Sequence, residues 1–298
     1  MPEQSNSKPA EFGISILIPV YNEGEGLESF TQNLKTVIDS IEIPFEIIYV
    51  DDGSEDSTSS ILAAQPYTMI RHEFNRGYGA SIKTGLEHSH YDSIVIIDAD
   101  GTYSPGEILS MVEHLHSYDM VVGTRTGPDS HIPLTRRPAK WLIRVFAAWM
   151  VRQTIPDLNS GLRAIKRKEI MAIKRLLPDG FSLTTTVTIA FLSMGKRIYY
   201  HPIRYNKRVG KSKFHPITDT WNMILLILRT VVLLRPLNVF LPLCFLFAFF
   251  AFGVLILSKP ITGQFMDATF IVLMMASVQM FVLGLIADLI VRINLWTH

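Results

Sequence analysis

Cysteine is nearly absent from this chain of 298 residues, whose only thiol is Cys244 in an apolar run. A single cysteine excludes a disulfide framework and a cysteine-based metal site, and it fits a reducing compartment. Net charge is almost absent too, because 28 Lys and Arg residues oppose 27 Asp and Glu residues. No overall field marks the chain as a nucleic-acid binder, so any anion must be recognised locally.

The first residues lack the pattern of a signal peptide, which is a basic region followed by an apolar core. Residues 1–11 are polar and rich in Ser, Pro and Gln, and we expect them to be disordered. We therefore place the start of the folded chain at residue 12.

Charge is missing from two long segments near the C-terminus, 237–257 and 268–287. Each has about 20 residues, enough for a helix to cross a hydrocarbon core of about 30 Å. A pair of buried globular helices is the alternative, but apolar character on all sides at this length favours a membrane. The segment between them, 258–267, is too short for a domain and is expected to form a tight turn. The sequence therefore predicts a transmembrane hairpin over residues 236–292.

Arginines flank this hairpin on one side. Arg229, Arg235 and Arg292 lie on the side of the larger, N-terminal part of the chain, whereas the turn offers only Lys259. The positive-inside rule places that larger part in the cytoplasm. We therefore expect a multi-pass protein of the cytoplasmic, or inner, membrane whose larger, N-terminal part lies in the cytoplasm.

Two further segments, 139–152 and 220–234, combine apolar and basic residues near helical spacing. Both are too short and too charged to span a bilayer, and both suit an interfacial helix at the level of the headgroups. For 139–152, an amphipathic helix packed on the domain core is an equally good interpretation. Residues 215–235 are predicted to form an interfacial juxtamembrane helix that leads into the hairpin.

The remaining part, 12–214, alternates apolar strands with helices, which is typical of an α/β domain with a mostly parallel sheet. Strands are expected at 14–20, 45–50, 68–71 and 93–97, and helices at 26–40, 57–64 and 80–89. In such sheets the ligand crevice lies at the carboxyl ends of the strands. Polar and acidic residues follow three of these ends, namely Tyr21, Asn22 and Glu23, then Asp51 and Asp52, then Asp98 and Asp100.

Asp98 and Asp100 flank a single residue directly after a buried strand. With an ion between them, both carboxylates can serve one cation. Mg2+ or Mn2+, hard ions that prefer oxygen ligands, would bridge this pair to a diphosphate. Solvated acidic turns are common, so residue type alone is a weak indication of a metal site. The stronger indication is the position of the pair at a strand end that faces other acidic turns. The sequence therefore predicts a divalent-metal site here.

Cations gather after the predicted sheet, where Arg208, Lys211 and Lys213 stand close together. Gly210 among them allows the backbone to approach an anion closely. A phosphate site and a membrane-facing patch attracted to anionic lipids are equally good interpretations of these residues taken alone.

Several of these residues belong to motifs that occur in a particular order. The motifs are Pro19-Val20-Tyr21-Asn22-Glu23, Asp51-Asp52-Gly53-Ser54, Asn75-Arg76-Gly77, Asp98-Ala99-Asp100 and Gly123-Thr124-Arg125. In this order they resemble the inverting family-two glycosyltransferases of the GT-A fold. Two later segments, 157–163 and 208–213, are similar to motifs of the narrower group of dolichyl- and polyprenyl-phosphate sugar synthases, in which a two-helix tail also occurs.

The resemblance implies a role for each motif residue. The residues implied to bind the nucleotide are Pro19, Tyr21, Glu23, Asp52, Arg76 and Asp98, and those implied to bind the metal are Asp98 and Asp100. The residues implied to surround the acceptor phosphate are Arg125, one of Arg136 and Arg137, Arg208, Ser212 and Lys213. The catalytic candidates are Asp157, Asp100 and Arg125, and the family places the motif of Asp157 beside the reaction centre, where it acts either as a base or by positioning the substrates.

These roles imply a polyprenyl-phosphate hexosyl or N-acetylhexosaminyl transferase, which moves a sugar with inversion from a UDP-sugar or GDP-mannose to a polyprenyl phosphate. A phosphate monoester has a second pKa of about 6 and is largely dianionic at neutral pH, so a strong general base is hardly needed. The expected partners are the nucleotide-sugar donor, the lipid phosphate and the membrane, and a homo-oligomer stays open.

Two alternatives differ from this interpretation. The first is a processive or other membrane glycosyltransferase that acts on a hydroxyl acceptor. Processive synthases usually carry a Gln-x-x-Arg-Trp sequence and more membrane spans, and this sequence has neither. The second is a membrane scaffold that keeps the fold without activity, and the intact acidic and basic motifs argue against it.

Overall fold

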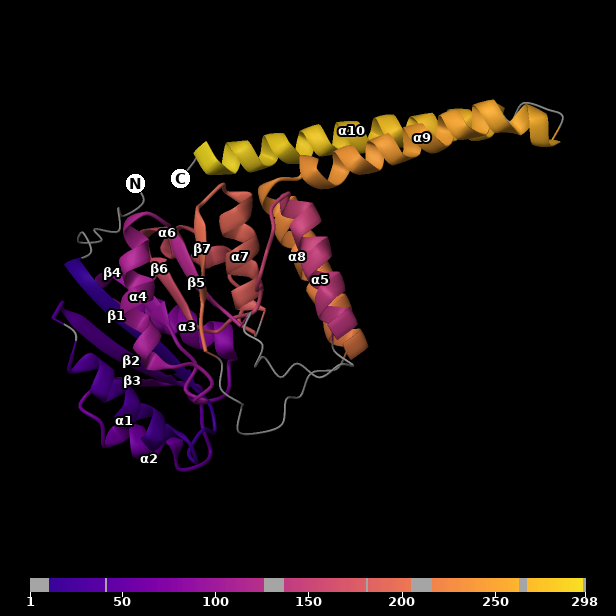
Figure 1. Cartoon of the computed structure of the whole chain (residues 1–298). Coiled ribbons are helices and arrows are strands. Elements are labelled where there is room, and N and C mark those ends of the chain that lie inside the picture. The colour runs from indigo at the N-terminus through magenta and orange to yellow at the C-terminus, as the bar shows by residue number, and fades with distance from the viewer. Residues whose placement is uncertain are drawn as a thin grey trace.

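The chain folds into an α/β domain from which a long helical hairpin extends (Figure 1). The computed structural model describes residues 11–40, 42–125, 137–180, 182–204, 216–262 and 267–296. Of the segment predicted to be disordered, only Glu11 is described, and it begins the first strand.

Seven strands form one sheet in the order β3-β2-β1-β4-β6-β5-β7. Their bounds are β1 Glu11–Val20, β2 Phe45–Asp51, β3 Thr68–Arg71, β4 Tyr91–Ile96, β5 Met120–Thr124, β6 Arg163–Lys166 and β7 Ile198–Pro202. Strand β6 runs antiparallel to its neighbours β4 and β5, and all the other pairs are parallel. The sheet is therefore mostly parallel, as predicted.

Successive residues of the strands face opposite helical layers, because side chains alternate across a pleated strand. On β1, Ile16 packs in the layer of α1, α2 and α4, whereas its neighbour Leu17 packs in the layer of α3, α6 and α7. Burial on both faces explains why these strands are nearly continuous apolar runs. The helices are α1 Leu27–Ile38, α2 Thr58–Ala63, α3 Tyr78–His88, α4 Ile108–Glu113, α6 Arg167–Ala172 and α7 Leu183–Ser193, with 3-10 turns η1 Pro105–Glu107, η2 His114–His116 and η4 Lys174–Leu176.

The two helices predicted to lie at a membrane interface pack against each other and against α7. They are α5 Arg137–Val151 and α8 Pro216–Leu234. Their contact buries Ile143 and Ile227, whereas Trp141, Trp149 and Trp221 are 58%, 58% and 61% exposed. One face of α5 therefore packs on the domain, as in the interpretation of a core-packed amphipathic helix, and its opposite face is exposed.

The two long apolar helices, α9 Leu237–Thr262 and α10 Asp267–Trp296, lie side by side (Figure 1). Their apolar stretches have mean hydropathies of 2.7 and 2.4, and only 6% and 11% of the most apolar windows are buried. These helices are long and apolar enough to cross a membrane, and such low burial contradicts the alternative of core helices.

The predicted turn at 258–267 is wrong in its first half, because Ser258–Thr262 continue α9. Pro260 does not stop the helix in the way that sequence reasoning assumed. Prolines are tolerated in apolar helices where neighbouring groups satisfy the freed carbonyl.

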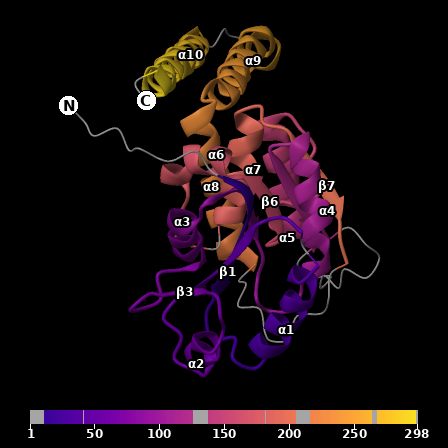
Figure 2. The same ribbon diagram turned by 90° about the vertical axis from the view of Figure 1, so that its left-hand side faces the viewer.

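The hairpin and the α5–α8 pair run in different directions. In Figures 1 and 2 the pair runs along one side of the α/β domain, across the direction of α9 and α10, and meets the hairpin at its base. The exposed tryptophans therefore stand on two helices that run across the hairpin.

Candidate active site

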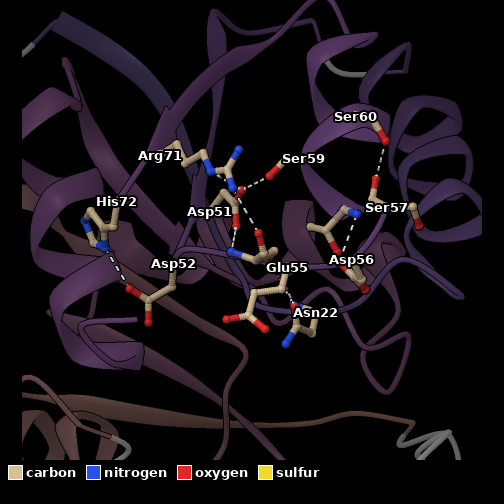
Figure 3. A network of polar contacts seen from close by, with 12 residues as sticks. Asn22, Asp51, Asp52, Glu55, Asp56, Ser57, Ser59, Ser60, Arg71 and His72 are labelled. Carbon is tan, nitrogen blue, oxygen red and sulfur yellow. Dashed lines mark hydrogen bonds and ion pairs between the residues drawn. The ribbon is translucent and has the colours of Figure 1, made fainter. Parts of the chain in front are cut away.

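The loops after β1 and β2 are joined by hydrogen bonds between backbone and side chains (Figure 3). Asn22 N donates to Ser54 Oγ at 3.0 Å, and Glu55 N donates to Asn22 Oδ1 at 2.9 Å. Asn22 has a φ of 54°, in the left-handed region that asparagine tolerates better than most residues. One turn after β1 is thus held by the turn after β2.

Asp51, at the end of β2, is fully buried and satisfied by protein groups. Its Oδ1 accepts a hydrogen bond from Ser54 N at 2.9 Å, and its Oδ2 accepts one from Ser59 Oγ. The Nε atom of Arg71 lies 3.5 Å from the same Oδ2 (Figure 3). This carboxylate therefore closes the β2 turn from within.

Asp52 is 3% exposed and also directs both oxygens at protein donors. Its Oδ1 lies 2.7 Å from His72 Nδ1 and accepts from Arg76 N at 2.9 Å, and its Oδ2 accepts from Gly77 N at 2.7 Å. Gly77 has a φ of 102°, and a Cβ there would lie 2.6 Å from the carbonyl oxygen of Asp179. Asp52 therefore fixes the turn that carries Arg76.

The other predicted nucleotide residues lie at the same edge of the sheet. Asp52 N donates to the carbonyl of Val20 at 2.9 Å, which ties the residues around Tyr21 to the Asp52–Arg76 turn. Tyr21 is 43% exposed, and Arg76 is exposed as well. Pro19 and Glu23 are half-buried. The structure thus brings these predicted residues to one surface and leaves two large side chains accessible on it.

Asp98 and Asp100, the predicted metal ligands, are half-buried at the end of β4. Asp100 Oδ1 accepts hydrogen bonds from Thr102 N at 3.1 Å and Thr102 Oγ1 at 2.6 Å, which fixes its orientation. Asp98 lies against the backbone of Gly161, where a Cβ would collide with its Oδ2. Any larger residue at position 161 would displace this carboxylate.

This carboxylate pair fits a hard divalent cation. It offers oxygen donors at a strand end, and both side chains are held in place by their surroundings. Within the ranges that the structure describes, no three His, Cys, Asp or Glu side chains gather into a metal site. A cation here would therefore take its remaining ligands from substrate oxygens and water, as Mg2+ commonly does.

Arg125 and Asp157 form a two-pronged ion pair. Arg125 Nε lies 2.8 Å from Asp157 Oδ2 and Arg125 Nη2 lies 2.8 Å from Oδ1, and the backbone N of Arg125 donates to Oδ2 at 3.2 Å. Burial alone would raise the pKa of Asp157, but the hydrogen bonds and charge of Arg125 outweigh it and lower the pKa below its usual range. Asp157 is therefore ionised and paired at neutral pH.

The direction of β6 explains why these two residues meet. Arg125 follows the carboxyl end of β5, and residues 157–162 precede the amino end of β6. Because β6 is antiparallel to β5 and β4, its amino end lies at the same edge as their carboxyl ends. The structure thus brings Asp157 to the edge that also holds Asp98.

The predicted acceptor-phosphate residues fall mostly outside the described ranges. Arg136, Arg208, Ser212 and Lys213 lie outside them, and Arg137 is described only as the first residue of α5. The described residues that precede these two basic segments lie next to each other. Ile203 N, after β7, donates to the carbonyl of Thr124 at 3.1 Å, at the end of the parallel strand β5.

Sequence reasoning assigned no role to three residues that surround Asp98. Gly161 stands in a quoted motif, and its backbone N donates to Tyr103 Oη at 2.8 Å. Tyr78 is buried beside Asp98, and burial together with that negative charge raises the tyrosine's pKa well above its usual value. The phenol therefore stays protonated. The glycine was visible in the sequence, whereas no local pattern marks either tyrosine.

A sheet of this topology with an acidic pair at its carboxyl edge defines the class of GT-A nucleotide-sugar-binding domains. The fold is similar to that of glucosyl-3-phosphoglycerate synthase from Mycobacterium tuberculosis, solved in complex with Mn2+, UDP and phosphoglyceric acid. The TM-score is 0.60 at 20% sequence identity, over 74% of this chain and 78% of that one.

Residues 15–173 match the family described as Glycosyl transferase family 2, and the chain belongs to this family. It is 30% identical over 267 residues to the undecaprenyl-phosphate 4-deoxy-4-formamido-L-arabinose transferase of Edwardsiella ictaluri, covering 87% of this chain and 80% of that protein. It is 27% identical over 212 residues to the undecaprenyl-phosphate mannosyltransferase of Micrococcus luteus, covering 66% and 85%. The protein is a glycosyltransferase.

Proposed function

We propose that this glycosyltransferase moves a sugar, with inversion, from a nucleotide-sugar donor to a polyprenyl phosphate at a membrane surface. The observation that carries the proposal is one sheet edge that combines the Asp98–Asp100 pair with the Arg125–Asp157 pair, on a domain joined to an exposed apolar hairpin. The names of two relatives, both undecaprenyl-phosphate sugar transferases, support the same acceptor class. The sugar is a hexose or an N-acetylhexosamine carried by UDP or GDP.

The donor side of the site consists of Tyr21, Arg76 and the acidic pair. We assign the nucleotide to the surface between Tyr21 and Arg76, and we assign Asp52 the indirect role of holding the Arg76 turn. Asp98 and Asp100 would hold Mg2+ or Mn2+ on the donor diphosphate. The bound ion would stabilise the negative charge that develops on the leaving nucleoside diphosphate.

The acceptor side requires cations rather than a base. A lipid phosphate is already largely dianionic at neutral pH, and two polyanions must approach each other. Asp157 is a poor base because its pKa is lowered, so we assign it the role of orienting Arg125 toward the acceptor phosphate. Arg136 or Arg137, Arg208, Ser212 and Lys213 complete the proposed phosphate site.

The membrane side of the proposal follows from the arrangement of the helices. If α9 and α10 cross the bilayer, α5 and α8 run along its surface, because they lie across the hairpin (Figure 1). Exposed tryptophans on α5 and α8 suit the headgroup level, where an amphipathic ring is stabilised. Arg229, Arg235 and Arg292 would then stay on the cytoplasmic side.

Cysteine labelling tests this topology. In a Cys244→Ser background, Asp267→Cys should react with an impermeant maleimide added to intact spheroplasts, and Arg235→Cys should react only after lysis. Labelling of both positions only after lysis would contradict the hairpin.

Product analysis tests the activity. The purified protein in micelles is incubated with undecaprenyl phosphate, Mn2+ and one nucleotide sugar at a time, and the organic phase is analysed by mass spectrometry. The expected result is a lipid-linked monosaccharide with one donor and none with the Asp100→Asn variant. Donor cleavage with every sugar released into water, or transfer only to a saccharide hydroxyl, would contradict the proposal.

A further inference from the structure

Arg163 is a fully buried charged residue at the start of β6. Its Nε donates to the carbonyl of Ser160 at 2.9 Å and its Nη2 to the carbonyl of Leu158 at 3.0 Å. Its Nη1 donates to Thr188 Oγ1 of α7 at 2.8 Å. Burying a guanidinium is costly unless its donors are satisfied, and an apolar side chain would fill the same space more cheaply. The guanidinium adds direction, because its donors diverge toward fixed acceptors.

Helix α7 meets the same loop with buried hydroxyl groups. Thr185 and Thr188 are fully buried, and Thr185 Oγ1 donates to Asn159 Oδ1 at 2.5 Å. Thr188 Oγ1 donates to the carbonyl of Thr184 at 3.0 Å, which leaves its oxygen oriented to accept from Arg163. We call Arg163, Thr185 and Thr188 the loop support.

The supported loop, 157–161, carries two contacts of the active site. Asp157 binds Arg125, and Gly161 lies against Asp98. The loop support holds the carbonyls and the side chain between them, at positions 158, 159 and 160. Each end of the loop thus faces the site, and its middle is fixed to α7.

We infer that the loop support is a positioning unit for the transfer reaction, which sets both the Arg125–Asp157 pair and the backbone of Gly161 beside Asp98. The inference rests on the proposed function, since it assigns the two contacts to the acceptor and donor sides of one reaction. None of the three side chains touches the substrates in this account. Their loss loosens the loop but places no new atom against Asp98, unlike a side chain at Gly161, so the effect falls on the rate of transfer rather than on donor affinity.

The test compares two isosteric substitutions two residues apart in α7. Thr188→Val removes one acceptor of Arg163. Thr186→Val removes a hydroxyl that is also buried but that bonds, among the described residues, only to the carbonyl of Ser182 at 3.1 Å, one turn earlier in the chain. Thr188→Val should lower kcat about tenfold with the donor KM unchanged, the size expected for loss of a hydrogen bond to a charged group. Thr186→Val should change kcat less than about twofold, because the carbonyl of Ser182 keeps its bond from the backbone N of Thr186 at 3.0 Å.

Arg163→Lys is the second variant, since a lysine keeps the charge but cannot reach two carbonyls and a hydroxyl with the same fixed geometry. It should lower kcat by about a hundredfold relative to the wild type although the positive charge is kept, as expected when more than one such bond is lost.

Hydrogen–deuterium exchange of the peptide that contains 158–162 gives a readout that needs no activity. Exchange there should be faster in Thr188→Val and Arg163→Lys than in Thr186→Val. Equal exchange in the two valine variants would overturn the inference whatever the activity. Equal kcat in the two, with an active wild type, would overturn it as well. Absence of lipid-linked product from the wild type with every donor would instead refute the proposed function.

Discussion

Two acidic turns of this protein look alike in the sequence and differ in the structure. Asp51 and Asp52 follow β2, and Asp98 and Asp100 follow β4, at the same edge of a mostly parallel sheet. The first pair is 0% and 3% exposed and faces protein donors, whereas the second pair is half-buried beside a glycine that leaves room. Residue type and strand end thus locate the edge, and burial separates the carboxylates that hold its turns together from the pair that we propose binds the metal.

Substitutions in the second pair, Asp98 and Asp100, should separate the two turns most clearly. Asp98→Asn and Asp100→Asn should each reduce transfer by about three orders of magnitude, because loss of a metal that acts as a Lewis acid costs several kcal/mol in the transition state. Their Tm values should stay within about 3 °C of the wild type, as for a substitution of partly exposed groups. Steady-state rates and thermal unfolding in micelles measure the two effects.

Excess chelator is the matched control, since it should inactivate the wild type to the same level as either asparagine variant. Full activity in chelator would remove the metal from the account and leave the two acidic turns without a functional difference.

Asp51→Asn should act mainly on stability, whereas Asp98→Asn and Asp100→Asn act mainly on transfer activity. The carboxylate accepts from both Ser54 N and Ser59 Oγ, whereas an asparagine turns an amide NH2 toward one of them, so a buried donor is left unsatisfied. The expected loss is about 2 kcal/mol, or about 4–8 °C in Tm for a domain of this size. An Asp51→Asn protein with an unchanged Tm but no metal-dependent donor binding would reverse the roles given to the two turns.

Asp157 combines features of both turns, because protein donors hold its carboxylate, as in Asp51, but it lies beside the proposed acceptor. Asp157→Asn keeps the shape of the side chain and weakens its hold on Arg125, so we expect kcat to fall roughly ten- to a hundredfold with donor affinity unchanged. Steady-state kinetics with varied lipid phosphate, beside calorimetry with the nucleotide, separates the two. A Gly161→Ala control should instead act through Asp98 and impair metal-dependent donor use. Loss of nucleotide binding in Asp157→Asn would assign this residue to the donor side.

The smallest expected effect is the pH dependence of stability that Asp157 contributes. Its pKa is lower in the folded protein than the value of about 3.9 in an unfolded chain, so its contribution is fully present above that value and is lost as pH falls through the folded pKa. Between pH 7 and pH 3, the wild type should therefore lose more of its free energy of unfolding than Asp157→Asn does, by at most about 1.3 kcal/mol, the limit that an unfolded pKa of about 3.9 sets at pH 3. Parallel loss in both proteins would show that the ion pair does not stabilise the fold.

Much of the ligand edge could be predicted from the sequence. The strands that end near Val20, Asp51 and Ile96 are apolar runs of β-branched residues, and polar turn residues follow each of them. The hairpin helices were equally evident, because nothing but their length and uniform composition is needed to identify them.

The rest depends on direction and burial, which no local pattern encodes. β6 is short and could run either way, yet its antiparallel direction is what brings Asp157 to Arg125 and Gly161 to Asp98. Arg163 was visible only as one residue of a motif, and its role follows from the distant Thr188. The hydrogen bonds from Arg76 N and Gly77 N to the Asp52 carboxylate likewise come from the turn after another strand, β3.

We propose a phosphate on a polyprenyl lipid as the acceptor, and one competition assay tests this proposal. The protein, its active donor and Mn2+ are given equal amounts of undecaprenyl phosphate and undecaprenol, and the lipid products are separated by mass. We predict sugar on the phosphate alone, and we predict that Asp157→Asn slows its formation. Sugar on undecaprenol at a comparable rate would contradict this acceptor, because a hydroxyl would need a general base, and Asp157 is a poor one since its pairing with Arg125 lowers its pKa.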